Sequence, residues 1–138
     1  MTSRSARPSR PPRRSSRPKV PVAPAVLVVD DSAVARLAVA RRLRAEGFDV
    51  IEQASASPPK ETALGRAACA LLDLDLGDSD GCDLARSLLA RSPGLPIAFF
   101  SGSASRALID RARALGPVFA KPAELEAAVA WVRANAKG

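Results

Sequence analysis

The chain contains the stretch Ala25-Val26-Leu27-Val28-Val29-Asp30-Asp31-Ser32, which indicates how it folds. Its first five residues are apolar and mostly β-branched, which is typical of a strand buried on both faces of a parallel sheet. Ser32 is a good helix cap, and apolar residues recur at helical spacing from there until Gly47. The stretch therefore predicts a buried strand that ends in two carboxylates and leads into a helix extending to about residue 46. On that helix Arg36, Arg41 and Arg44 are expected opposite the apolar face.

The same alternation of strand and helix continues to the end of the chain. Strands are predicted at residues 48–53, 69–73, 96–100 and 118–120, and helices at 59–66, after Gly81, at 104–115 and from Pro122 onwards. Strict alternation with short links gives a parallel sheet with helices on both faces. We therefore predict an open, doubly wound α/β domain, with its binding site at the carboxyl ends of the strands.

The basic residues are concentrated at the start of the chain. The first 24 residues hold seven Lys or Arg, six Pro and no acid, whereas the rest holds 14 residues of each sign. Such a segment buries too little apolar surface to fold, so we expect a disordered Arg/Pro/Ser tail over residues 1–24 and one folded domain over residues 25–138. Three roles remain open for the tail: a solvated extension, an electrostatic arm for nucleic acid or acidic partners, and a proline-rich ligand. The folded part is neutral overall, so nucleic-acid binding is expected only through the tail.

Several classes of chemistry are excluded by composition. The chain has no histidine, which removes the commonest zinc ligand and every catalytic triad built on imidazole. Cys69 and Cys82 lack the spacing of a metal site, and no apolar run is long enough to cross a membrane. We expect a cytoplasmic protein with reduced thiols. Its chemistry must use carboxylates, hydroxyls or lysine.

Polar residues follow four of the predicted strands, and they are Asp30 and Asp31, then Asp73, then Ser101 with Gly102, then Lys121 with Pro122. Each has an ordinary alternative reading, as a solvated turn, a helix cap or an exposed Lys, although an unpaired Asp73 inside an apolar run would be expensive. Their joint placement favours a single site. Clustered carboxylates repel one another, and a hard divalent cation such as Mg²⁺ relieves the repulsion. Asp73 beside such a cation could accept a phosphoryl group, which Lys121 and Ser101 would help to neutralise.

At this point the chain from Ala25 onwards resembles the receiver domain of bacterial two-component response regulators. The stretches that carry the resemblance are Val28-Val29-Asp30-Asp31-Ser32, residues 72–81, Phe100-Ser101-Gly102 and Phe119-Ala120-Lys121-Pro122. The resemblance implies a flavodoxin-like fold, with a five-stranded parallel sheet in the order 2-1-3-4-5. It also implies that the face built by the fourth helix, fifth strand and fifth helix contacts other proteins.

The resemblance further implies a role for each of the strand-end residues. Asp73 would be the phosphoacceptor, and the Mg²⁺ site would comprise Asp31 as a direct ligand, Asp30 beside it, Asp73, and Asp75 through its backbone carbonyl. Ser101 and the following Gly102 would bind the phosphoryl group. Lys121 would pair with it, and a cis peptide bond is expected at Pro122.

Three departures from the family pattern affect the expected switch. Gly77 stands where the family usually has proline, and the turn between residues 116 and 121 is about two residues short. Val118 aligns where many members have a Tyr or Phe that changes rotamer on phosphorylation. Because the turn is short, Phe119 is the candidate for that aromatic role.

Three functions remain open, and the first two are implied by the resemblance. The first is a stand-alone receiver, a signalling protein and not an enzyme, which accepts a phosphoryl group on Asp73. Its donor would be a sensor histidine kinase, a histidine phosphotransfer protein or acetyl phosphate, and its output would be changed binding to an unknown protein target or homodimer formation. The second is a receiver-like adaptor that works without phosphorylation. The third is a Mg²⁺ phosphatase of the haloacid dehalogenase type, suggested by Asp73-Leu74-Asp75.

Overall fold

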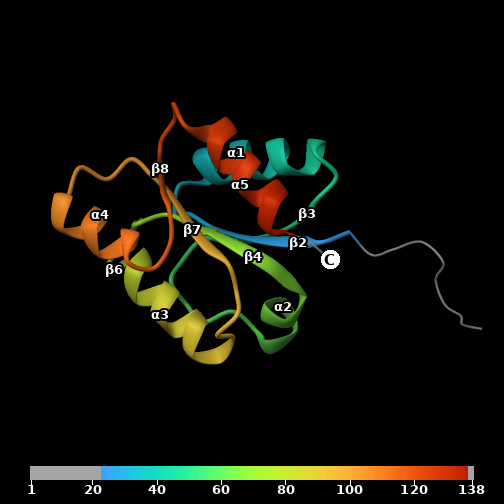
Figure 1. Ribbon diagram of the computed structural model, residues 1–138, viewed down its shortest axis with the longest axis horizontal. Coiled ribbons are helices and arrows are strands. Elements are labelled where there is room, and N and C mark those ends of the chain that lie inside the picture. Colours follow the sequence, from blue (N-terminus) through green and yellow to red (C-terminus); the bar gives the residue numbers. More distant parts are fainter. Residues whose placement is uncertain (1–22, 137–138) are drawn as a thin grey trace, which may run out of the picture.

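A single parallel sheet organises the computed structural model, which describes residues 23–136 (Figure 1). Its strands are β2 (Ala25–Val29), β3 (Asp49–Gln53), β4 (Ala67–Leu72), β7 (Ile97–Ser101) and β8 (Val118–Ala120). They lie in the order β3-β2-β4-β7-β8, and every neighbouring pair is parallel. The predicted order 2-1-3-4-5 is therefore confirmed.

Helices cover both faces of this sheet. They are α1 (Ala33–Ala45), α2 (Glu61–Arg66), α3 (Gly81–Arg91), α4 (Arg106–Arg113) and α5 (Leu125–Asn135). In Figure 1, α1 and α5 lie on one side of the sheet and α2 and α3 on the other. Side chains of α4 pack into the same core cluster as those of α2 and α3, which places α4 on their side.

The core is built by the alternation of side chains along each strand. On β2, Leu27 and Val29 pack towards α2, α3 and α4, whereas Val26 and Val28 pack towards α1 and α5. All five residues of β2 are buried. This burial on both faces explains why the central strands are continuous apolar runs.

A short hairpin beside the sheet was not predicted. Strands β5 (Asp75–Leu76) and β6 (Ser79–Asp80) pair antiparallel directly after β4. Gly77 has a φ of +69° in the turn, a conformation that glycine adopts without steric penalty. Each strand has only two residues, so no periodicity could have revealed it.

The last helix begins later than predicted. It starts at Leu125 and not at Pro122. Residues 120–124 form a closed turn instead, because Glu124 N–H donates to the Ala120 carbonyl at 2.8 Å and the Glu124 carboxylate accepts from Ala120 N–H at 2.7 Å. The other predicted elements agree with the structure to within a few residues at their ends.

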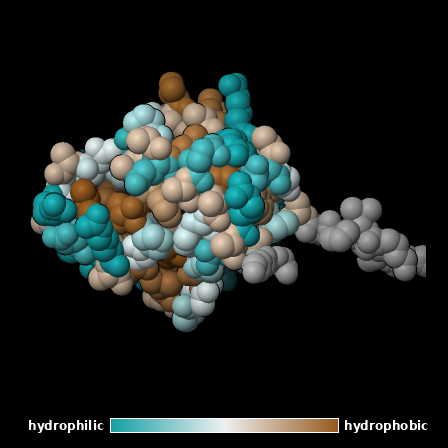
Figure 2. Space-filling model, turned by 45° about the horizontal axis from the view of Figure 1, so that its top comes forward, coloured by the Kyte–Doolittle hydropathy of each residue, from teal (hydrophilic) through white to brown (hydrophobic). Residues whose placement is uncertain are grey.

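The two cysteines lie in the core of the described part of the chain. Cys69 and Cys82 are free and buried, and burial raises the pKa of Cys69 to about 12 and also raises that of Cys82. Figure 2 shows hydrophobic groups scattered among polar ones, and the large apolar side chains that are exposed in the described part of the chain are Val34 and Leu37 on α1. No helix within residues 23–136 is long and apolar enough to span a membrane. The predicted tail lies almost entirely outside the described residues, so it stays a prediction.

Candidate functional site

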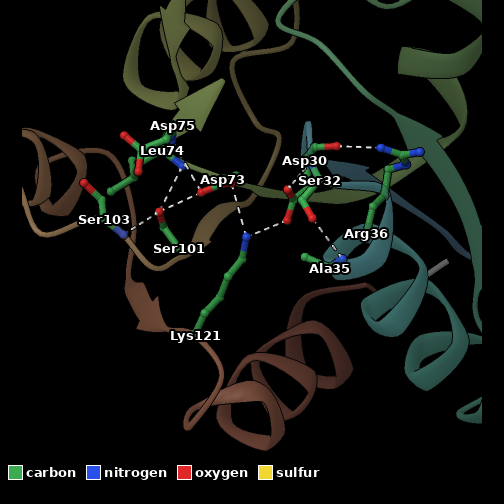
Figure 3. A network of polar contacts seen from close by, with 10 residues as sticks. All are labelled: Asp30, Ser32, Ala35, Arg36, Asp73, Leu74, Asp75, Ser101, Ser103 and Lys121. Carbon is green, nitrogen blue, oxygen red and sulfur yellow. Dashed lines mark hydrogen bonds and ion pairs between the residues drawn. The ribbon is translucent and has the colours of Figure 1, made fainter. Parts of the chain in front are cut away.

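The predicted site residues meet at the carboxyl edge of the sheet (Figure 3). Asp30 follows β2, Asp73 follows β4, Ser101 ends β7 and Lys121 follows β8. Because all these strands are parallel, their carboxyl ends lie along one edge. Segments up to 91 residues apart in sequence are thereby brought into hydrogen-bond contact.

Lys121 joins two of the carboxylates. Its Nζ lies 2.6 Å from Asp30 Oδ2 and 3.2 Å from Asp73 Oδ2. The exposed fractions of the three side chains are 18% for Lys121, 4% for Asp30 and 8% for Asp73. Buried charges are tolerated when they are paired, so the Lys121 ammonium offsets the cost of burying these two carboxylates.

Ser101 holds the other oxygen of Asp73. Its hydroxyl donates to Asp73 Oδ1 at 2.6 Å and accepts from the Ser103 N–H at 3.2 Å and the Leu74 N–H at 3.4 Å. The Asp75 N–H also lies 3.4 Å from Asp73 Oδ1. Both carboxylate oxygens of Asp73 are therefore oriented by donors that come from separate strands.

The acid–base properties of this cluster follow from burial and from its charges. Burial raises the pKa of Asp30, as does the nearby charge of Asp73, against the opposing effect of hydrogen bonds from Lys121 and from the Ser32 N–H. Burial alone would lower the pKa of Lys121, but the hydrogen bond to Asp30 and the charges of both acids outweigh it, and the pKa is raised. The lysine is thus firmly cationic, whereas Asp30 holds its negative charge less readily than an ordinary carboxylate.

Three carboxylates are close enough to share a metal ion. Asp30, Asp31 and Asp73 each offer an oxygen within 4.8 Å of the others, and Asp31 is exposed to solvent. When all are ionised, three negative charges face the single positive charge of Lys121. An excess of oxygen ligands and negative charge suits a hard divalent cation such as Mg²⁺. The side chain of Asp75 is exposed and outside this group, and its predicted contribution through the backbone carbonyl stays a prediction.

Two further predicted residues flank the cluster. Gly102 follows Ser101 and is exposed, and a Cβ at this position would lie 3.9 Å from the Lys121 Cβ. The Lys121–Pro122 peptide bond is cis, as the resemblance implies. Gly102 and Pro122 thus directly follow the two residues that supply the hydroxyl and the amine of the site, Ser101 and Lys121.

Phe119 is not brought to the site. Alternation along β8 turns its side chain towards α1 and α5, where it packs against the core cluster of that face. Val118 and Ala120 point to the opposite face and line a cavity of about 110 Å³ together with Ser101. Phe119 therefore lies on the face of the sheet opposite the cavity beside Ser101, and the small residues Val118 and Ala120 lie on the side of the hydroxyl.

Sequence reasoning missed the contribution of Arg36. It was expected opposite the apolar face of α1, yet its guanidinium turns back and donates from Nη1 to the Asp30 carbonyl at 2.8 Å. The side chain is only 17% exposed. The six-residue separation crosses the end of a strand, a turn and the start of a helix, so no periodic signal in the sequence could have indicated the contact.

The arrangement of an acid pair, a buried acid, a hydroxyl and a lysine on consecutive strand ends agrees with a comparison of the sequence with known families. Residues 26–133 match the response regulator receiver domain. The chain belongs to this family. Receiver domains act in two-component phosphorelay signalling, in which phosphorylation of an Asp and binding of Mg²⁺ are family features.

Solved receiver domains share the fold at low sequence identity. A CheY-like receiver domain from Methanospirillum hungatei is 22% identical with a TM-score of 0.70, over 82% of this chain and 93% of that one. A receiver domain from Clostridium thermocellum is 15% identical with a TM-score of 0.73, over 83% and 94%. The Vibrio cholerae chemotaxis protein CheY4 is 20% identical with a TM-score of 0.68, over 83% and 99%. No curated protein matches the chain in sequence.

Proposed function

We propose that this receiver domain accepts a phosphoryl group on Asp73 and signals by changed protein binding. The proposal rests on the burial and the hydrogen bonds of the Asp73 carboxylate. It is buried at the strand edge, with one oxygen bonded to Ser101 and the other to Lys121, beside two further acids. Such a carboxylate is pre-oriented as a nucleophile and has charge-neutralising groups already around it.

The transfer step follows from these contacts. One Asp73 oxygen forms a bond to phosphorus, and the bond between phosphorus and the donor's nitrogen or oxygen breaks, with its electron pair leaving on the donor. The Lys121 ammonium and the Ser101 hydroxyl, which now bind Asp73, are placed to bind the phosphoryl oxygens instead. The same two side chains would therefore register whether Asp73 is modified.

A divalent cation would be held by the carboxylates of Asp30, Asp31 and Asp73, with Asp75 contributing its backbone carbonyl. When bound, Mg²⁺ supplies charge neutralisation between the carboxylate and the incoming phosphoryl group. The exposed Asp31 leaves this side of the cluster open to solvent. Gly102 and Pro122 directly follow Ser101 and Lys121, and they would border the phosphoryl group that these two side chains bind.

The sequence has no histidine, so a phosphohistidine donor would lie outside these 138 residues. We propose a phosphohistidine on a sensor histidine kinase or a histidine phosphotransfer protein, with acetyl phosphate as a small-molecule substitute. The modified protein would then bind a downstream protein or a second copy of itself, and light scattering before and after labelling distinguishes these two outputs.

Intact-mass measurement after incubation with acetyl phosphate and Mg²⁺ tests the proposal. We expect one phosphoryl adduct that is labile to alkali. Asp73→Asn should abolish it, whereas Asp78→Asn, in the exposed turn of the nearby hairpin, should not. Equal labelling of the Asp73 variant, or no labelling of the unmodified chain, would reject the proposal. The latter result would favour a phosphorylation-independent adaptor, and continuous release of phosphate from a phosphomonoester would favour a phosphatase.

A further inference from the structure

Arg36 ties the strand end that carries the acid pair to two neighbouring elements. It projects from the first turn of α1, and its Nη1 donates to the Asp30 carbonyl at 2.8 Å (Figure 3). Its Nε donates to Glu52 Oε1 on β3 at 3.3 Å. The guanidinium thus uses two of its donors in a fixed fork, which a flexible ammonium cannot reproduce.

Glu52 is itself held in place. Its second oxygen, Oε2, lies 3.1 Å from Arg44 Nη2, and its backbone belongs to β3 beside β2. The Asp30 N–H also donates to the Gln53 carbonyl at 3.0 Å. The backbone of Asp30 is therefore anchored at its N–H by β3 and at its carbonyl by Arg36.

The Asp30 carbonyl belongs to the same planar peptide unit as the Asp31 N–H. Holding that plane fixes the position of the Asp31 Cα atom and so restricts where the Asp31 side chain can lie. Among residues 23–136, no hydrogen bond or ion pair holds the Asp31 carboxylate itself, and the side chain is exposed. Its position relative to Asp30 and Asp73 thus depends on the backbone that Arg36 anchors.

We propose that Arg36 is a positioning residue for the divalent cation, acting through the Asp30–Asp31 peptide. The inference rests on the proposed function of the acid cluster. The loss of a charge and the loss of a backbone anchor would change the affinity for the cation in opposite directions, so the two effects can be told apart. Removing a positive charge near an acidic site should strengthen cation binding, whereas releasing the peptide should weaken it by leaving Asp31 unconstrained.

The test compares Arg36→Met with Arg41→Met, which makes the same charge change on the exposed side of the same helix. Mg²⁺ affinity is measured from the backbone amide shifts of Asp31 and Asp73 during titration without any phosphodonor. Residues that orient metal ligands typically change affinity by about 10–100-fold, and we expect a loss of about tenfold in Arg36→Met. Arg41→Met should bind Mg²⁺ as well as the unmodified chain or slightly better.

A second readout separates positioning from loss of structure. With acetyl phosphate, Arg36→Met should need about tenfold more Mg²⁺ for half-maximal labelling but reach a similar maximum rate, since Asp73 and its partners are intact. Arg36→Lys keeps the charge but not the forked guanidinium, so its Mg²⁺ requirement should lie between those of the unmodified chain and Arg36→Met. Glu52→Gln, which replaces the ion pair with Arg36 by a neutral hydrogen-bond acceptor, should shift the requirement in the same direction by a smaller factor.

The inference and the proposed function fail in different ways. If Arg36→Met binds Mg²⁺ as tightly as Arg41→Met, or if Arg36→Lys is fully equivalent to the unmodified chain, the positioning role is rejected while labelling of Asp73 is untouched. If the unmodified chain binds Mg²⁺ and shows the Arg36 effect but is never labelled, the phosphoacceptor proposal fails and the positioning role survives. Should Arg36→Met not fold, Glu52→Gln and Arg36→Lys decide the question by the same titration.

Discussion

Replacing Lys121 by Met should make the protein less stable without Mg²⁺ and more strongly stabilised by it. The substitution keeps the apolar stem and removes the positive charge that, among residues 23–136, pairs with the carboxylates of both Asp30 and Asp73. Removing one partner of a buried ion pair costs about 3–5 kcal/mol, and the partial exposure of Lys121 favours the lower end of that range. Without the lysine, the Asp30 and Asp73 carboxylates repel each other, and this repulsion favours the binding of a divalent cation.

The gain in Mg²⁺ affinity can be bounded from the same contacts. Two unit charges about 4 Å apart interact by about 4 kcal/mol at an effective dielectric constant of 20, and solvent screening at this edge reduces that value. We therefore expect Mg²⁺ to bind about tenfold more tightly to Lys121→Met, which corresponds to about 1.4 kcal/mol. Well above both dissociation constants, added Mg²⁺ should then stabilise the variant by about 1.4 kcal/mol more than the unmodified protein.

Urea unfolding followed by the fluorescence of Trp131, the single tryptophan, measures both effects over a series of Mg²⁺ concentrations. Lys60→Met is the control, because Lys60 is exposed before α2 and makes no side-chain cap. An equal or smaller Mg²⁺ response in Lys121→Met than in the control would refute the electrostatic reasoning. The variant should also respond weakly to phosphorylation, as measured by light scattering before and after labelling, since the partner of the phosphoryl group is missing.

Two further predictions concern the backbone and the acid pair. Gly81→Ala should lower the free energy of unfolding by about 2–3 kcal/mol and slow labelling, because the added Cβ would overlap the carbonyl oxygen of Asp73. Gly94 has open space around it, so the control Gly94→Ala should change the free energy of unfolding by less than about 0.5 kcal/mol in the same urea assay. The raised pKa of Asp30 means that its contribution to stability is fully present below the unfolded pKa and is lost as the pH rises through the folded pKa. In Mg²⁺-free buffer, the stability of the unmodified chain relative to Asp30→Asn should therefore rise as the pH falls, and an identical pH profile for both would contradict the burial argument.

The elements of the fold were predictable because their signals are local. The run from Ala25 to Val29 is apolar at every position since β2 is covered on both faces, and Ser32 caps α1 through a hydrogen bond to the Ala35 N–H. The alternation of such runs with helical patterns is enough to specify a doubly wound parallel sheet. The ends of parallel strands must then meet at one edge, so the grouping of Asp30, Asp73, Ser101 and Lys121 followed from topology alone.

Contacts between side chains of different elements were not predictable in the same way. The amine of Lys121 could have faced solvent, and only packing shows that it bridges Asp30 and Asp73. The short strands of the β5–β6 hairpin and the late start of α5 depend on hydrogen bonds that leave no periodic pattern. These features arise from distances that exist only after the chain has folded.

Two residues show where local patterns end and tertiary packing begins. Helical spacing places Arg36 among the polar positions of α1, but its guanidinium turns towards the end of β2 and donates a hydrogen bond to the Asp30 carbonyl. Phe119 is near the site in sequence, but the two-residue period of β8 turns it to the far face of the sheet. Periodicity in the sequence thus establishes which elements form and which edge carries the chemistry. Which atoms touch there is decided by packing, because hydrogen bonds and ion pairs depend on separations of a few ångströms between segments that are far apart along the chain.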